Sequence, residues 1–80
     1  MTLGDAVARR IEELLIKNQW SLYKLSKDSC VPLSTLKNLY TKHTKCPTLA
    51  LIYKLAEAFK ITPLEFLSPE YFNIDNVEYD

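Results

Sequence analysis

Apolar residues recur along most of the chain at intervals of three and four, which is the period of a helix with one buried face. The pattern predicts an amphipathic helix over residues 5–18, with Asp5 near the positive end of its dipole. The apolar positions of this helix are Val7, Ile11, Leu14 and Leu15. No stretch shows the β-branched alternation of a half-buried strand, so the sequence predicts an all-α fold.

Two short helices separated by a tight turn are predicted next. Ser21 is a good N-cap for a helix that runs to about Asp28. After a break, Pro32 has a fixed φ that suits the first turn of a new helix over residues 32–40. The apolar stripe of this second helix is narrow and consists of Leu33, Leu36 and Leu39. Its other face is polar.

Two further helices complete a predicted bundle of five. Residues 41–47 form a polar loop, after which Thr48 caps a helix with apolar residues Leu51, Ile52, Leu55, Ala56 and Phe59. The last helix has Thr62 as its cap, Pro63 at its first position and Glu65 closing a capping box. Its apolar residues, Leu64, Phe66 and Leu67, are expected to close the core.

We expect residues 1–68 to form one domain and residues 69–80 to be an acidic, aromatic tail. The tail is expected to be loosely held, with Tyr71, Phe72 and Ile74 either folding back on the core or meeting a partner. Trp20 is expected to pack against the first and last helices.

Charge is unevenly distributed although the net charge of the 80 residues is zero. Residues 21–60 carry seven lysines against Asp28 and Glu57, and residues 61–80 carry five acids and no base. The middle of the chain could therefore face a polyanion that would repel the tail. A solvated surface with no such partner is the alternative.

Composition indicates no metal, cofactor or catalytic chemistry. Cys30, Cys46 and the single His43 are too few for a zinc site, and both cysteines are expected to be reduced and structural. There is no Cys-His pair at a credible spacing, no glycine-rich phosphate loop and no inward carboxylate pair, so an enzyme is disfavoured. No export signal or membrane span is recognisable, and a cytoplasmic location is expected.

The chain resembles the lambda-repressor-like (Xre/Cro-type) helix-turn-helix regulators over about residues 5–68. The resemblance rests on four segments in the family's order and spacing: Trp20 to Ser26, Val31 to Leu39, Pro47-Thr48-Leu49 leading into the fourth helix, and Ile61 to Leu67. It implies a bacterial or phage regulator, most simply a repressor, that reads the major groove of duplex DNA with the helix at residues 32–40.

The resemblance also implies two sets of DNA contacts. The candidate base contacts are Leu33, Ser34, Thr35, Lys37 and Asn38, of which Asn38 can read adenine through its amide. The candidate phosphate contacts are Ser21, Lys24, Tyr40, Lys42, His43 and Lys45. Simple solvation is the alternative for each polar side chain, and Leu36 and Leu39 are expected to be core.

Some positions depart from the family's usual pattern. Leu22 stands where a glutamine commonly contacts the DNA backbone, and Leu33 replaces a more usual polar residue. Cys30 and Lys42 stand where glycine is frequent, in turns that often need a left-handed conformation.

One short helix reads few base pairs, so a symmetric homodimer spanning about 34 Å of DNA is expected. The candidate dimer contacts are Phe66, Leu67, Tyr71 and Phe72, with a closed core contact as the alternative. A protein-interaction module, such as an antitoxin or anti-repressor partner that uses the acidic tail, is the alternative function.

Overall fold

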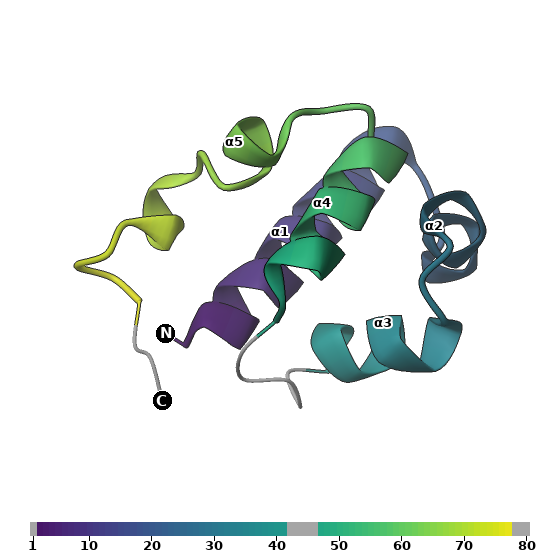
Figure 1. Ribbon diagram of the computed structural model, residues 1–80, viewed down its shortest axis with the longest axis horizontal. Coiled ribbons are helices and arrows are strands. Elements are labelled where there is room, and N and C mark those ends of the chain that lie inside the picture. The colour runs from purple at the N-terminus through teal and green to yellow at the C-terminus, as the bar shows by residue number, and fades with distance from the viewer. Residues whose placement is uncertain (1, 42–46, 78–80) are drawn as a thin grey trace.

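The computed structural model describes residues 2–41 and 47–77, and all of its elements are helical, which confirms the all-α prediction. Five α-helices and one short 3₁₀ helix follow in chain order (Figure 1). They are α1 (Leu3–Asn18), α2 (Leu22–Ser29), α3 (Leu33–Tyr40), α4 (Leu49–Ala58), α5 (Pro63–Phe66) and η1 (Glu70–Phe72).

Helices α2 and α3 lie at one end of the molecule, and α5 and η1 lie at the other (Figure 1). Helix α3 packs against both α1 and α2, whereas α4 packs against α2 and α5. The short turn between α2 and α3 therefore joins two helices that are each held by a longer neighbour. The contacts of α3 with α1 and α2 fix its orientation.

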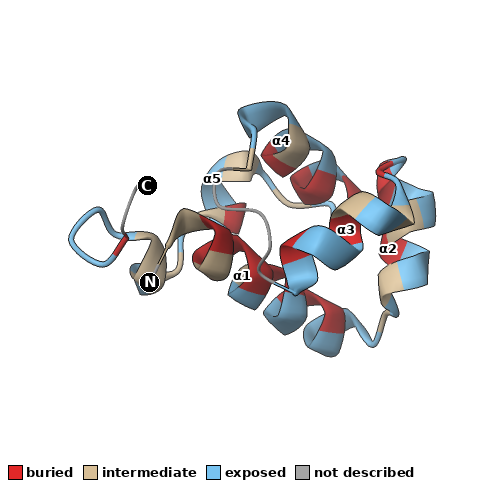
Figure 2. Cartoon of the chain, turned by 90° about the horizontal axis from the view of Figure 1, so that it is seen from below, coloured by how far each residue is buried: buried red, intermediate tan, exposed pale blue. Residues whose placement is uncertain are grey.

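Each of the five α-helices contributes a side chain with no solvent exposure to a single core. These side chains are Ile11, Leu25, Leu36, Leu55 and Phe66, one from each helix in order. Figure 2 shows the buried positions gathered on the facing sides of the helices. Because every helix buries an apolar residue in the same cluster, loss of any one helix would expose apolar surface on the others.

The prediction that Leu64 closes the core is wrong. Leu64 is 83% exposed, whereas Phe66 is fully buried and Leu67 is half-buried. Helix α5 has only four residues, so only one side of it can face the core, and Phe66 occupies that side. The single turn leaves the Leu64 side chain in solvent.

Three helix starts differ in detail from the sequence predictions. Helix α1 begins at Leu3 because Thr2 forms a capping box with Asp5, in which each side chain binds the other residue's backbone N–H. Pro32 is the N-cap of α3 rather than its first helical residue, since its ψ of 140° is extended. Thr62 caps α5 by accepting from the Glu65 N–H, but the Glu65 carboxylate does not accept from the Thr62 N–H, so the predicted capping box is incomplete.

The chain after α5 folds back on α1, as one of the two alternatives for the tail predicted. The Tyr71 hydroxyl donates to the Glu13 carboxylate, and the Arg9 guanidinium lies 4.4 Å from the centroid of the Tyr71 ring. The Phe72 ring packs on Phe66, with 6.5 Å between centroids. Burial, followed by the hydrogen bond to Glu13, raises the pKa of Tyr71 above its ordinary value. Ile74, by contrast, is 69% exposed.

Trp20 packs against the end of α4, a contact that the sequence did not predict. Its ring stacks on Phe59, with the centroids 5.1 Å apart and the planes at 19°. Phe59 is the C-cap residue of α4, so this stacking holds the end of α4 beside the connection between α1 and α2.

Candidate nucleic-acid interface

The turn between α2 and α3 is held by side chains of α2. Cys30, the C-cap of α2, has a left-handed conformation with φ 59° and ψ 24°, as expected for a position where glycine is frequent. The Ser26 hydroxyl donates to the Val31 carbonyl at 2.7 Å, and the Val31 N–H donates to the Ser29 hydroxyl at 3.3 Å. These bonds fix the angle at which α3 leaves the turn.

The sequence placed Ser29 in the break between the two helices, but it did not predict the side-chain bonds of Ser26 and Ser29. Ser29 is buried, and its hydroxyl also donates to the Leu25 carbonyl at 2.6 Å. Serine near a helix end is a recognised signal for side-chain to backbone bonding. The sequence carries this signal, but the hydrogen-bond partners of the two serines are known only from the folded turn.

Helix α3 presents a polar face to solvent and an apolar face to the core. Leu36 and Leu39 are fully buried, as predicted. Ser34, Lys37 and Asn38 are exposed, and their spacing of three and four residues brings them to neighbouring positions on the outer face. Three of the five candidate base contacts therefore share one accessible surface.

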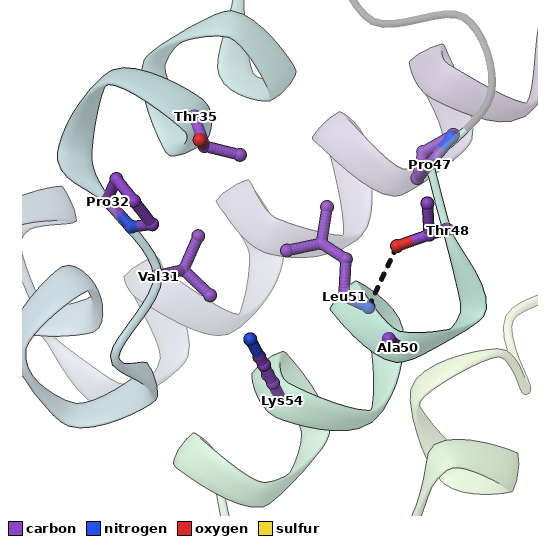
Figure 3. A pocket seen from close by; sticks show the side chains of 8 residues that line it. All are labelled: Val31, Pro32, Thr35, Pro47, Thr48, Ala50, Leu51 and Lys54. Atoms are coloured by element: carbon purple, nitrogen blue, oxygen red, sulfur yellow. Dashed lines mark hydrogen bonds between the residues drawn. The ribbon is translucent and has the colours of Figure 1, made fainter.

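The other two candidates lie at the edges of this surface. Leu33 and Thr35 are both half-buried. Thr35 faces a groove between α3 and α4, which it lines together with Val31 and Lys54 (Figure 3). These two side chains are less accessible to a base edge than Ser34 or Asn38.

The candidate phosphate contacts on α2 are partly engaged within the protein. The Ser21 hydroxyl accepts from the Lys24 N–H at 3.1 Å and caps α2. The Lys24 ammonium lies 3.0 Å from the Asp28 carboxylate and 5.2 Å from the centroid of the Trp20 ring. Asp28 therefore offsets the positive charge that Lys24 would offer to an anion.

The remaining phosphate candidates divide into one described residue and three others. Tyr40, at the last position of α3, is 40% exposed. Lys42, His43 and Lys45 lie outside the described residues. Among the described lysines only Lys24 forms an ion pair, so Lys37 on α3 and Lys54 on α4 form none. Lys54 was not among the sequence-predicted contacts, because nothing in the spacing along α4 brings it to α3.

A short helix with a polar face of small hydrogen-bonding groups and a lysine, and with no acid, suits contact with DNA base edges. The family model of the Cro/C1-type HTH DNA-binding domain matches residues 10–70, which is more than half of the chain. This chain belongs to the Cro/C1-type HTH family. The resemblance to lambda-repressor-like regulators is thereby confirmed, and the matched model describes a DNA-binding domain.

No curated protein and no solved structure matches the chain. Within residues 2–41 and 47–77, no three His, Cys, Asp or Glu side chains are grouped so that they could hold a metal ion. None of the described helices of this Cro/C1-type domain is both long and apolar enough to span a membrane.

Two departures from the family's usual residues have clear structural settings. Leu22, at the first position of α2, is half-buried and packs against the core. Cys30 occupies a left-handed turn without being glycine, at a cost of about 1 kcal/mol. The domain keeps its fold in both places, because the apolar contact of Leu22 and the serine bonds around the turn support the same α2 to α3 geometry.

Proposed function

We propose that this Cro/C1-type protein is a sequence-specific transcriptional regulator that inserts α3 into the major groove of duplex DNA. The observation that carries the proposal is the outer face of α3, where Ser34, Lys37 and Asn38 are exposed together and no acid is present. Such side chains can donate to and accept from base edges, whereas a carboxylate there would be repelled by the phosphates.

Ser34, Lys37 and Asn38 are the proposed base contacts, with Leu33 and Thr35 making apolar or methyl contacts at the edges of the face. The Asn38 amide reads an adenine, and Lys37 reads a guanine. The proposed phosphate contacts lie before α3 in the sequence, at its last residue and in the segment that follows it. They are Ser21, Lys24, Tyr40, Lys42, His43 and Lys45.

The regulator acts as a symmetric dimer, because α3 has eight residues and alone covers too few base pairs for selectivity. Phe66 is fully buried, and Tyr71 and Phe72 pack within the chain, so these three residues are not included among the proposed dimer contacts. Leu67 remains a proposed dimer contact. Leu64, three residues earlier in the chain, is exposed and is added to the proposed dimer surface. A dimer on one face of the duplex occludes its site, which supports repression.

Selection of binding sites from a random duplex library, at low and at near-physiological salt, tests the proposal. Enrichment of a short motif in two inverted copies is the expected result. Asn38→Ala should relax the preference at one position of each half-site, with a cost of about 1 to 3 kcal/mol for the preferred base. Glu12→Ala, on the exposed side of α1, is the matched control and should leave the motif unchanged.

Dimerisation is tested separately by sedimentation at micromolar concentration, with and without operator duplex. Leu64→Ser should shift the protein toward monomer without unfolding it, since the side chain is 83% exposed. Binding with no enriched motif at any salt would instead favour the protein-interaction module, and the acidic tail would become the surface to examine.

A further inference from the structure

A groove of about 340 Å³ separates the start of α3 from the first two turns of α4 (Figure 3). Val31, Pro32 and Thr35 form one wall, and Thr48, Leu51 and Lys54 belong to the other. The lining is mainly apolar, with Lys54 as its one charged side chain. The groove is therefore a shallow apolar channel with a single cation at its edge.

The Lys54 ammonium has no ion-pair partner within the described part of the chain. The one acid on α4 is Glu57, and no bond joins it to Lys54. In Figure 3 the nitrogen end of the Lys54 side chain points across the groove toward Val31, away from the α4 backbone. The side chain thus directs at the flank of α3 a positive charge that no ion pair holds, although Asp28 and Glu57 line a neighbouring pocket with Lys54.

Lys54 and Lys37 lie on opposite flanks of α3. Thr35, which shares the groove with Lys54, is two residues before Lys37, and two residues correspond to about 200° of rotation around a helix. Ser34 and Asn38 lie on the face between them. The surface proposed to face the bases therefore has Lys37 at one edge and Lys54 beyond the other edge, and neither lysine forms an ion pair with the described residues.

A helix in the major groove has a sugar-phosphate backbone on either side of it. We propose that Lys54 binds a phosphate of the strand that passes the α4 side of α3, and that the groove beside Thr35 receives the adjoining deoxyribose. The inference rests on the proposed function, since it requires α3 to lie in the major groove. Charge complementarity selects the DNA backbone as the occupant, because the groove offers one cation and apolar walls suited to a sugar.

Lys54→Gln tests the assignment, because it removes the charge and keeps the length and helix propensity of the side chain. Duplex binding is titrated by fluorescence anisotropy from 50 to about 300 mM salt, on a selected duplex and on an unrelated one. The slope of log K against log salt should fall by about 0.9, and the affinity at 0.1 M salt by about eightfold, equally on both duplexes. Lys54→Arg should retain the wild-type slope.

Lys17→Gln is the matched control, since Lys17 is exposed on the last turn of α1 and carries no ion pair with the described residues. It removes the same charge and should change the slope by less than half as much. An unchanged slope in Lys54→Gln, with wild-type binding intact, overturns the Lys54 assignment and leaves the proposed function standing. Absence of salt-dependent duplex binding by the wild type overturns both.

Discussion

Arg10 on α1 holds α5 in place, and its removal should destabilise the domain far more than removal of its neighbour Arg9. The Arg10 Nε donates to the Phe66 carbonyl at 2.8 Å, and its Nη2 donates to the Glu65 carbonyl at 3.0 Å. The Arg10 side chain is only 15% exposed. The guanidinium thus satisfies carbonyls at the end of α5, where a helix has no partners of its own.

The expected loss of unfolding free energy in Arg10→Met follows from these two bonds. The bond to Phe66 is charge-assisted and partly buried, and is worth about 1.5 to 3 kcal/mol. The bond to Glu65 is exposed, and that carbonyl also accepts from Ser68, so its loss adds less than about 1 kcal/mol. The sum is about 1.5 to 4 kcal/mol, equivalent to a fall in Tm of about 6 to 30 °C for a domain of this size.

Urea unfolding, followed by Trp20 fluorescence, measures this change, and Arg9→Met is the matched control. Arg9 is 54% exposed, makes a 3.7 Å ion pair with Glu13 and lies 4.4 Å from the centroid of the Tyr71 ring, so the loss of these two exposed contacts should cost about 1 kcal/mol. Arg10→Lys keeps the charge but lacks the forked donors, and should recover less than half of the loss. Equal destabilisation by Arg10→Met and Arg9→Met would refute the role of the carbonyl bonds.

Three other changes have distinct expected outcomes. Cys30→Gly should raise the free energy of unfolding by about 0.5 to 1 kcal/mol, and with it the urea midpoint, because glycine adopts the left-handed turn without strain; an unchanged or lower midpoint would contradict this. The Tyr71 pKa is raised above 10.0, so the unfolded chain releases this proton first and the free energy of unfolding should fall as pH rises above about 10. Tyr71→Phe should show a smaller fall in the same urea series, and equal falls would count against the assignment. Asp28→Asn frees Lys24 and should steepen the salt dependence of DNA binding by up to about 0.9, an effect that Lys24→Gln in the same background should abolish.

The positions of the helices were predictable because their causes are local. Ser21, Thr48 and Thr62 cap helices at the predicted places, and the spacing of Leu36 and Leu39 identified the buried side of α3. Caps and helical periodicity act over three or four residues, so they can be recognised before any tertiary contact is known. The same locality made the polar face of α3 and the family resemblance recognisable.

Contacts between residues distant in the chain were decided by the tertiary structure. The periodicity around Leu64 predicted burial, but only the packing of α5 shows that Phe66 takes its one inward side. Arg10 meets two carbonyl oxygens only because α5 packs beside it, more than fifty residues further along the chain. Lys54 likewise meets the flank of α3 only because α2 packs against both α3 and α4. Sequence alone specifies which faces are apolar, whereas the partner of each face depends on how all five helices fill one core together.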